Sequence, residues 1–177
     1  MDNSDFEYYE ENKTNIFTEK LYHDIELFRN LEIVKNGDIN AAYFIFKSYM
    51  ISRNKDAHYY LKMAADGGHK DCQFFIGIFY YLGYFYSEKD YNEAFKWILK
   101  SALNNNKAGM YIIYKFYKYG IGTSINDDKS KIWKFMYETF VHENHEQLKH
   151  LNYYQYIDFT ETESERWLRK NIDNLFN

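Results

Sequence analysis

The chain of 177 residues has a single cysteine, Cys72, so an intrachain disulfide is impossible and a secreted scaffold held by disulfides is excluded. Its N-terminus lacks a basic segment followed by an apolar run, and no stretch approaches the roughly 18 uninterrupted apolar residues of a membrane span. We therefore expect a soluble, intracellular protein that does not contact a membrane. Its compartment is expected to be the cytoplasm, or the host cytoplasm if the chain is viral or an effector.

Sequence features of common catalytic sites are also missing. No glycine-rich phosphate loop precedes a predicted helix, and no Ser/His/Asp or Cys/His order stands out. The segment over residues 142–150 gathers the histidines His142, His145 and His150 with two glutamates, and imidazoles at such spacing can bind zinc. It lacks the His-Glu-x-x-His spacing of metalloproteases, however, and otherwise has the composition of an exposed polar helix. The sequence thus predicts no enzyme, no cofactor and no metal site.

A surplus of positive charge is missing as well. The chain has 22 Lys and Arg against 26 Asp and Glu, which gives a formal net charge of -4. Because neutralisation of phosphates dominates the affinity for nucleic acids, this balance argues against a general nucleic-acid binder. A local basic surface remains compatible with it.

What the chain does have is aromatic side chains at helical spacing. Aromatic residues make up 21% of the sequence, far from the low hydrophobicity of a disordered chain. Within residues 72–108, Phe75 and Phe79 belong to a three- and four-residue apolar pattern that predicts a helix with one packed face. Asp90 is a candidate N-cap of a second helix, which carries Trp97. An isolated pair of such helices would expose apolar surface, so neighbouring helices must cover it.

The same spacing returns along the chain with a period in the mid-thirties. Corresponding positions of the first helices are Ala41, Ile45 and Tyr49, then Cys72, Ile76 and Tyr80, then Gly109, Ile113 and Tyr117. The second helices align through Ala57, Ala94 and Ser130, which are 37 and 36 residues apart. Trp97, Trp133 and Trp167 are 36 and 34 residues apart, which extends the pattern toward the C-terminus. This period predicts helical hairpins stacked as a solenoid.

Several short motifs fit one known repeat. They are Ala64–Gly68, Ile76-Gly77 followed by Tyr80 and Gly83, Ala94–Trp97 followed by Lys100, and Tyr119–Gly122. These motifs resemble the Sel-1-like repeat, a relative of the tetratricopeptide repeat, over residues 39–140 and more weakly over residues 143–176. The resemblance implies an all-α, right-handed α-solenoid of stacked antiparallel helix pairs. Within it, Gly77 leaves room for a second backbone to approach closely.

We expect a flexible acidic tail over residues 1–15, an N-terminal capping helix over 16–37, and three repeats over 38–68, 69–105 and 106–141. Residues 142–177 are expected to form a degenerate fourth repeat or a C-terminal cap. The capping helix is predicted to begin at Phe17 and to end at Asn36-Gly37, a typical stop signal. The last helix is predicted to begin at a capping-box pattern, Thr160 to Glu163, and to carry Trp167.

Related repeats line the concave face of the solenoid with the first helix of each hairpin, and solenoids commonly bind partners on that face. Carried over by register, the candidate partner-binding residues are Tyr43, Lys47 and Met50 in the first repeat, Phe74, Ile78 and Tyr81 in the second, and Tyr111, Lys115, Lys118 and Tyr119 in the third. Tyrosine offers a large contact area with a polar tip, and lysine can pair with a carboxylate. The apolar members would fit equally well as packing contacts between neighbouring repeats.

The sequence therefore predicts a protein-interaction adaptor or scaffold that binds a peptide or a partner helix in the concave groove. Two alternatives stay open. One is single-stranded nucleic-acid binding through Tyr111, Lys115, Lys118 and Tyr119. The other is a self-associating structural module. Neither the identity of the partner nor the oligomeric state follows from the sequence.

Overall fold

The computed structural model describes residues 3–84, 88–149 and 163–176, and within these ranges the chain forms eight α-helices, one short 3-10 helix and no strand. The all-α class predicted from the sequence is thereby confirmed. The chain divides into two compact units, Met1–Tyr60 and Leu61–Asn177.

The first unit consists of α1 (Asn3–Ile33), the 3-10 helix η1 (Val34–Asn36), α2 (Ile39–Ile51) and the beginning of α3 (Ala57–Asp66). α1 packs against α2, where the His23 ring lies 5.9 Å from the Phe44 ring and its Nε2 atom lies 3.1 Å from the Ser48 hydroxyl oxygen. Gly37 follows η1 with a φ of 81°, so the predicted stop signal at this glycine is confirmed.

Helix α1 begins at Asn3, before the Phe17 at which we expected the first helix to start. Residues 3–15 are therefore helical where the acidic composition suggested a tail. The physical reason lies in two features of the sequence: no glycine or proline interrupts residues 1–36, and acidic side chains near a helix N-terminus interact favourably with the helix dipole.

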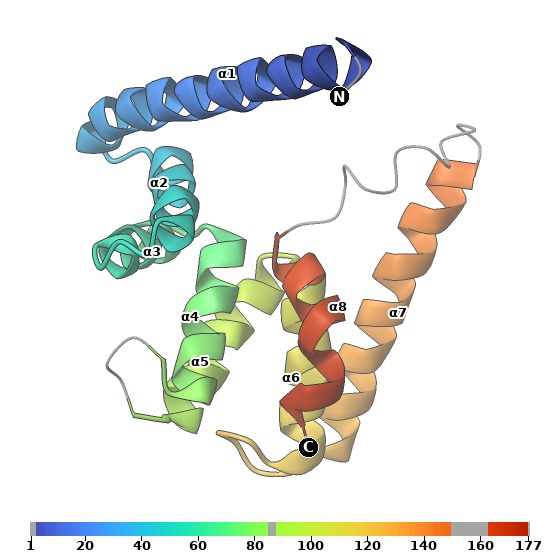
Figure 1. Cartoon of the computed structure of the whole chain (residues 1–177). Coiled ribbons are helices and arrows are strands. Elements are labelled where there is room, and N and C mark those ends of the chain that lie inside the picture. The colour runs from blue at the N-terminus through green and yellow to red at the C-terminus, as the bar shows by residue number, and fades with distance from the viewer. Residues whose placement is uncertain (1–2, 85–87, 150–162, 177) are drawn as a thin grey trace. The chain divides into compact units, whose positions relative to one another are not determined.

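The second unit continues from α3 into α4 (Lys70–Leu82), α5 (Tyr91–Leu103), α6 (Lys107–Tyr119), α7 (Asp127–Lys149) and α8 (Glu163–Leu175). α4 packs against α5, α5 against α6 and α6 against α7, so that consecutive helices form adjacent pairs (Figure 1). Fully buried side chains of these helices include Phe74, Ile78, Ile98, Ile112 and Phe116.

Side-chain caps determine where the helices of the second unit begin. The Asp90 carboxylate accepts hydrogen bonds from the N–H groups of Asn92 and Glu93, both at 3.0 Å, so the predicted N-cap of α5 is confirmed. The Asn106 side-chain oxygen caps α6 by accepting from the Gly109 N–H at 2.8 Å. Both caps satisfy N–H groups that the start of a helix leaves without an intrahelical partner.

Gly77 of α4 lies at a close crossing with α5. A Cβ atom at this position would lie 2.5 Å from Cγ1 of Ile98 and 3.1 Å from the carbonyl oxygen of Ala94. The close approach predicted at Gly77 is therefore confirmed. In the next pair, a Cβ atom on Gly109 of α6 would lie 2.9 Å from the backbone nitrogen of Ala102 in α5, so this glycine serves the same purpose.

The C-terminal part of the described chain consists of the end of α7 and of α8. α7 runs without a break to Lys149, past residue 143, where a new hairpin was expected to begin. α8 packs against α4 and α6, whereas a fourth repeat of a solenoid contacts only the third. Whether residues 142–177 form a degenerate repeat or a C-terminal cap stays a prediction. Glu163 is the first residue of α8, and its predicted capping partner Thr160 lies outside the described residues.

Candidate functional site

Helix α8 presents one face to α4 and α6. Ser164, Leu168 and Leu175 are buried on this face, and Lys170 and Asn174 are exposed on the other, which is the pattern of an amphipathic helix docked along one stripe. Figure 1 shows α8 alongside α6, and its contacts extend to α4. Since α4 and α6 are the first helices of their hairpins, α8 covers the face at which the sequence predicted partner binding.

Four of the predicted partner-binding residues contact α8 or Phe176, which directly follows it. We call them the α4/α6 face: Phe74 and Tyr81 of α4, and Lys115 and Tyr119 of α6. The Phe74 ring meets the Trp167 ring at its edge, with 5.9 Å between the centroids. The Tyr81 hydroxyl donates a hydrogen bond to the Leu175 carbonyl oxygen at 2.8 Å. Burial, with a smaller contribution from Tyr91, raises the pKa of Tyr81, which keeps this hydroxyl protonated as a donor.

The Lys115 ammonium group lies among aromatic rings. Its Nζ atom is 5.4 Å from the Tyr111 ring centroid, 5.3 Å from Tyr114, 5.7 Å from Tyr119 and 5.6 Å from Phe176, which follows α8. Burial acts to lower the pKa of Lys115, but a hydrogen bond with Tyr111 and the neighbouring tyrosines outweigh it, and the pKa is raised. Lys115 therefore stays charged and interacts with the faces of these rings.

A buried polar cluster connects the first turn of α8 to α4 and α6, and we call it the Asp71 cluster. The Ser164 hydroxyl donates to Oδ1 of Asp71 at 2.6 Å, and Nδ2 of Asn106 donates to the same oxygen at 2.8 Å. Nδ2 of Asn106 also donates to the Ser164 hydroxyl oxygen at 2.8 Å. Asp71 is 6% exposed, Asn106 is 1% exposed and Ser164 is 0% exposed. Next to the cluster, Nζ of Lys107 lies 3.4 Å from Oε1 of Glu165.

The other predicted binding residues of the second unit, Ile78, Tyr111 and Lys118, differ in their exposure and contacts. Ile78 is fully buried, which agrees with the alternative that it is a packing contact between helices. Phe74 is fully buried too, in part beneath Trp167. The Tyr111 ring lies 5.4 Å from the Tyr137 ring of α7, and Lys118 remains exposed.

In the first unit, Tyr43, Lys47 and Met50 lie on α2. The Lys47 ammonium group lies 5.0 Å from the Tyr43 ring centroid, and Met50 is 41% exposed. Their role in binding stays a prediction.

Sequence reasoning missed Asp71, Asn106 and Ser164. Their separations along the chain are 35 residues between Asp71 and Asn106 and 58 residues between Asn106 and Ser164, so no local spacing signals the cluster. The one available signal was a polar residue at or near the expected start of each helix, which does not predict the contact between these residues.

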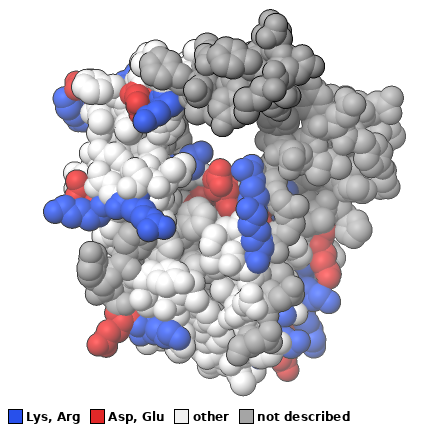
Figure 2. Space-filling model, viewed as in Figure 1, with Lys and Arg blue, Asp and Glu red and all other residues white. Residues whose placement is uncertain are grey.

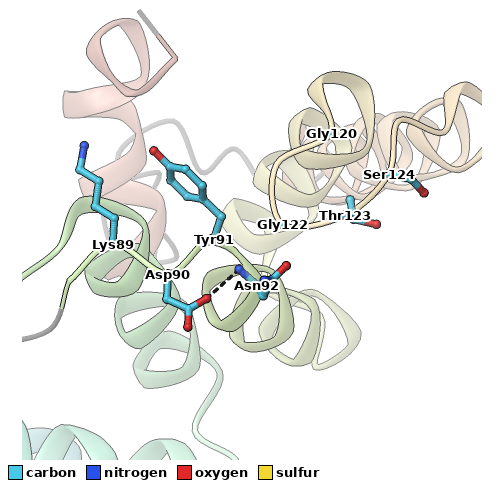
Figure 3. A pocket seen from close by; sticks show the side chains of 8 residues that line it. All are labelled: Lys89, Asp90, Tyr91, Asn92, Gly120, Gly122, Thr123 and Ser124. Carbon is cyan, nitrogen blue, oxygen red and sulfur yellow. Dashed lines mark hydrogen bonds between the residues drawn. The ribbon is translucent and has the colours of Figure 1, made fainter.

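A shallow depression lies between the start of α5 and the loop after α6 (Figure 3), and it is lined by Lys89, Asp90, Tyr91, Asn92, Gly120, Gly122, Thr123 and Ser124. Asp90, the only carboxylate in this lining, caps α5. A Cβ atom on Gly122 would collide with the Tyr91 carbonyl oxygen, so the loop packs directly on the start of the helix. The packing of this loop against the start of α5 therefore accounts for the depression.

Two further kinds of site, a metal site and a reactive thiol, were considered in the sequence and can be compared with the part of the chain that is described. Among its side chains, no group of three or more His, Cys, Asp or Glu is placed to hold a metal ion, and the side chains of His142, His145 and His150 lie outside it. Cys72 is fully buried, and burial, together with the charge of Asp71, raises the pKa of its thiol. The reactive thiolate is thereby disfavoured.

Charged side chains on the face shown in Figure 2 are scattered. Lys and Arg side chains lie among Asp, Glu and a larger uncharged surface on this face. Among the described residues, no helix is both long enough and apolar enough to cross a membrane.

Comparison with protein families matches the Sel1 repeat to residues 38–69 and 70–106. These segments contain α2 with α3 and α4 with α5, so the family resemblance seen in the sequence is confirmed for two hairpins. A search of curated proteins gave no match.

Two similar solved structures are repeat proteins of the same kind. A Sel1 repeat protein from Oxalobacter formigenes is 24% identical, with a TM-score of 0.61, and the match covers 64% of this chain and 88% of that protein. A protective antigen present in uropathogenic Escherichia coli strains, which displays an SLR fold, is 19% identical with a TM-score of 0.58, and the match covers 64% of this chain but 25% of the antigen. At these identities the similarity establishes the fold.

Proposed function

We propose that this chain, which carries Sel1 repeats, is a protein-interaction adaptor that holds a helix of a partner protein on the α4/α6 face. Sel1-repeat proteins generally mediate protein–protein interactions, and their repeat is a non-enzymatic scaffold fold. On the same grounds we propose that the chain has no catalytic activity of its own.

The observation that carries this proposal is the docking of α8 on the α4/α6 face. An amphipathic helix laid on an apolar surface is a recurrent mode of protein recognition, in which side chains one turn apart serve as anchors. Here Trp167 packs on Phe74, and near the other end of the helix the backbone carbonyl of Leu175 accepts a hydrogen bond from the Tyr81 hydroxyl. The face thus has the shape and chemistry to accept a helix.

Nucleic acid is the less favoured partner. Lys115, which the alternative needs for a phosphate, lies among four aromatic rings and hydrogen-bonds to Tyr111. The net charge of -4 and the scattered charges in Figure 2 argue in the same direction.

Affinity capture tests the proposal with two variants of the full chain. We expect the double variant Lys115→Glu with Tyr119→Ala to lose the proteins that the parent chain captures from cells, because both residues lie on the α4/α6 face. Tyr119 is 50% exposed, so its truncation should leave the fold intact.

The matched control is Tyr59→Ala on α3, where the tyrosine is 60% exposed and lies outside the α4/α6 face. This variant should capture the same proteins as the parent. Capture of one and the same set by all three chains, with equal melting temperatures, would show that the α4/α6 face does not bind partners.

A further inference from the structure

In the Asp71 cluster, a helix that docks on α4 and α6 has to supply a hydroxyl group that donates to the Asp71 carboxylate. Oδ1 of Asp71 accepts from Asn106 of α6 and from Ser164 of α8, and all three side chains are almost completely buried. A buried carboxylate that loses a donor bears the cost of desolvation without compensation. A helix that replaces α8 must therefore bring a hydroxyl to the same place.

The remaining contacts of α8 extend this description along the helix. One residue after the hydroxyl, the Glu165 carboxylate pairs with Lys107. Three residues after it, Trp167 packs on Phe74. At the far end, the Leu175 carbonyl accepts from the Tyr81 hydroxyl, and buried Leu168 and Leu175 complete the apolar stripe. The ion pair, the ring contact, the hydrogen bond at the far end and the apolar stripe thus specify both the direction and the register of a helix docked on this face.

Helix α8 is part of the same chain as the face that it covers. A tethered ligand binds at an effective concentration that is commonly in the millimolar range, so a separate helix of equal intrinsic affinity binds only weakly while α8 is docked. A partner helix therefore has to bind the face with higher intrinsic affinity than α8 in order to displace it.

From these contacts we infer that the α4/α6 face recognises a partner-protein helix with a Ser or Thr hydroxyl in its first turn, an acidic residue next to it, and Trp three residues after the hydroxyl. α8 is the internal competitor of that helix and has to leave before the partner binds. This inference rests on the proposed function and adds the chemistry of the partner to it.

The test uses a fluorescent peptide with the sequence of Glu163–Phe176 and two forms of the full chain. In the Trp167→Ala chain the internal α8 loses its main anchor, so the added peptide should bind at least about tenfold more tightly to this chain than to the parent. The same peptide with Ser164→Ala should bind the Trp167→Ala chain about tenfold more weakly. Fluorescence anisotropy measures both affinities.

A second format avoids dependence on the stability of the Trp167→Ala chain. A protease site placed within residues 150–162 allows the parent chain to be cut after folding, and the labelled peptide should then exchange with the released α8 fragment. Circular dichroism before and after cutting shows whether the rest of the chain stays folded.

Each outcome has a distinct meaning. Equal binding of the parent peptide and its Ser164→Ala form would overturn the recognition of a hydroxyl, while the proposed binding of helices would stand. No binding to the folded Trp167→Ala chain, and no exchange after cutting, would make α8 a permanent cap and overturn the inference. A dimer that grows with concentration in light scattering, with α8 exchanged between copies, would assign the face to a second copy and also overturn it. Loss of capture by the Lys115→Glu, Tyr119→Ala variant remains the separate test of the proposed function.

Discussion

Replacing Trp97 by alanine is expected to lower the free energy of unfolding by about 3–5 kcal/mol. Trp97 is 7% exposed on α5, so its truncation leaves a cavity between helices. The ammonium groups of Lys62 and Lys100 also lie 5.2 Å and 4.0 Å from its ring centroid, and both lose that contact. Urea unfolding followed by circular dichroism measures the change.

The control for Trp97 is Ile132→Ala, since Ile132 of α7 is 57% exposed. Its expected effect stays within about 0.5 kcal/mol, as for most surface substitutions. An unchanged unfolding midpoint for Trp97→Ala would contradict the assignment of this tryptophan to the core of the repeat.

The Asn106→Asp variant is expected to lose about 3 kcal/mol of stability at neutral pH. Aspartate caps a helix as well as asparagine does, so the acceptor for the Gly109 N–H is retained. The two donor hydrogens are lost, however, and the new carboxylate meets Asp71 at a position where the amide nitrogen now lies 2.8 Å from Oδ1. Like charges at this distance in a buried site repel strongly.

Asn105→Asp serves as the matched control, because it introduces the same charge one residue earlier at an exposed position. There the charge lies near the N-terminus of α6, where the helix dipole favours it, and the expected change is smaller than about 0.5 kcal/mol. Equal unfolding midpoints for the two variants would mean that the Asp71 cluster contributes little to the fold.

The helical hairpins and several of their boundaries could be predicted from the sequence because local physics determines them. Asp90 and Gly37 are terminal signals that act within a few residues. Gly77 was predictable as a close-packing position because a side chain there would collide with Ile98 in any hairpin of this geometry.

The position of α8 could not be predicted in the same way. Helical periodicity shows which face of α8 is apolar, but it does not show which helix that face meets. The regular spacing of Trp97, Trp133 and Trp167 suggested that the third tryptophan repeats the packing of the first two, whereas Trp167 lies on Phe74 of α4. The Asp71 cluster could not be predicted for the same reason, because Ser164 and Asp71 are 93 residues apart in the sequence.

Native-state hydrogen exchange of the parent chain tests most directly whether α8 is a displaceable occupant of the α4/α6 face. The amides of α8 should exchange through a partial opening that costs less free energy than the opening of α5 and α6, because α8 leaves while the hairpins remain folded. Exchange of the α8 amides only together with the slowest amides of α5 and α6 would contradict this account, since α8 would then be inseparable from the core.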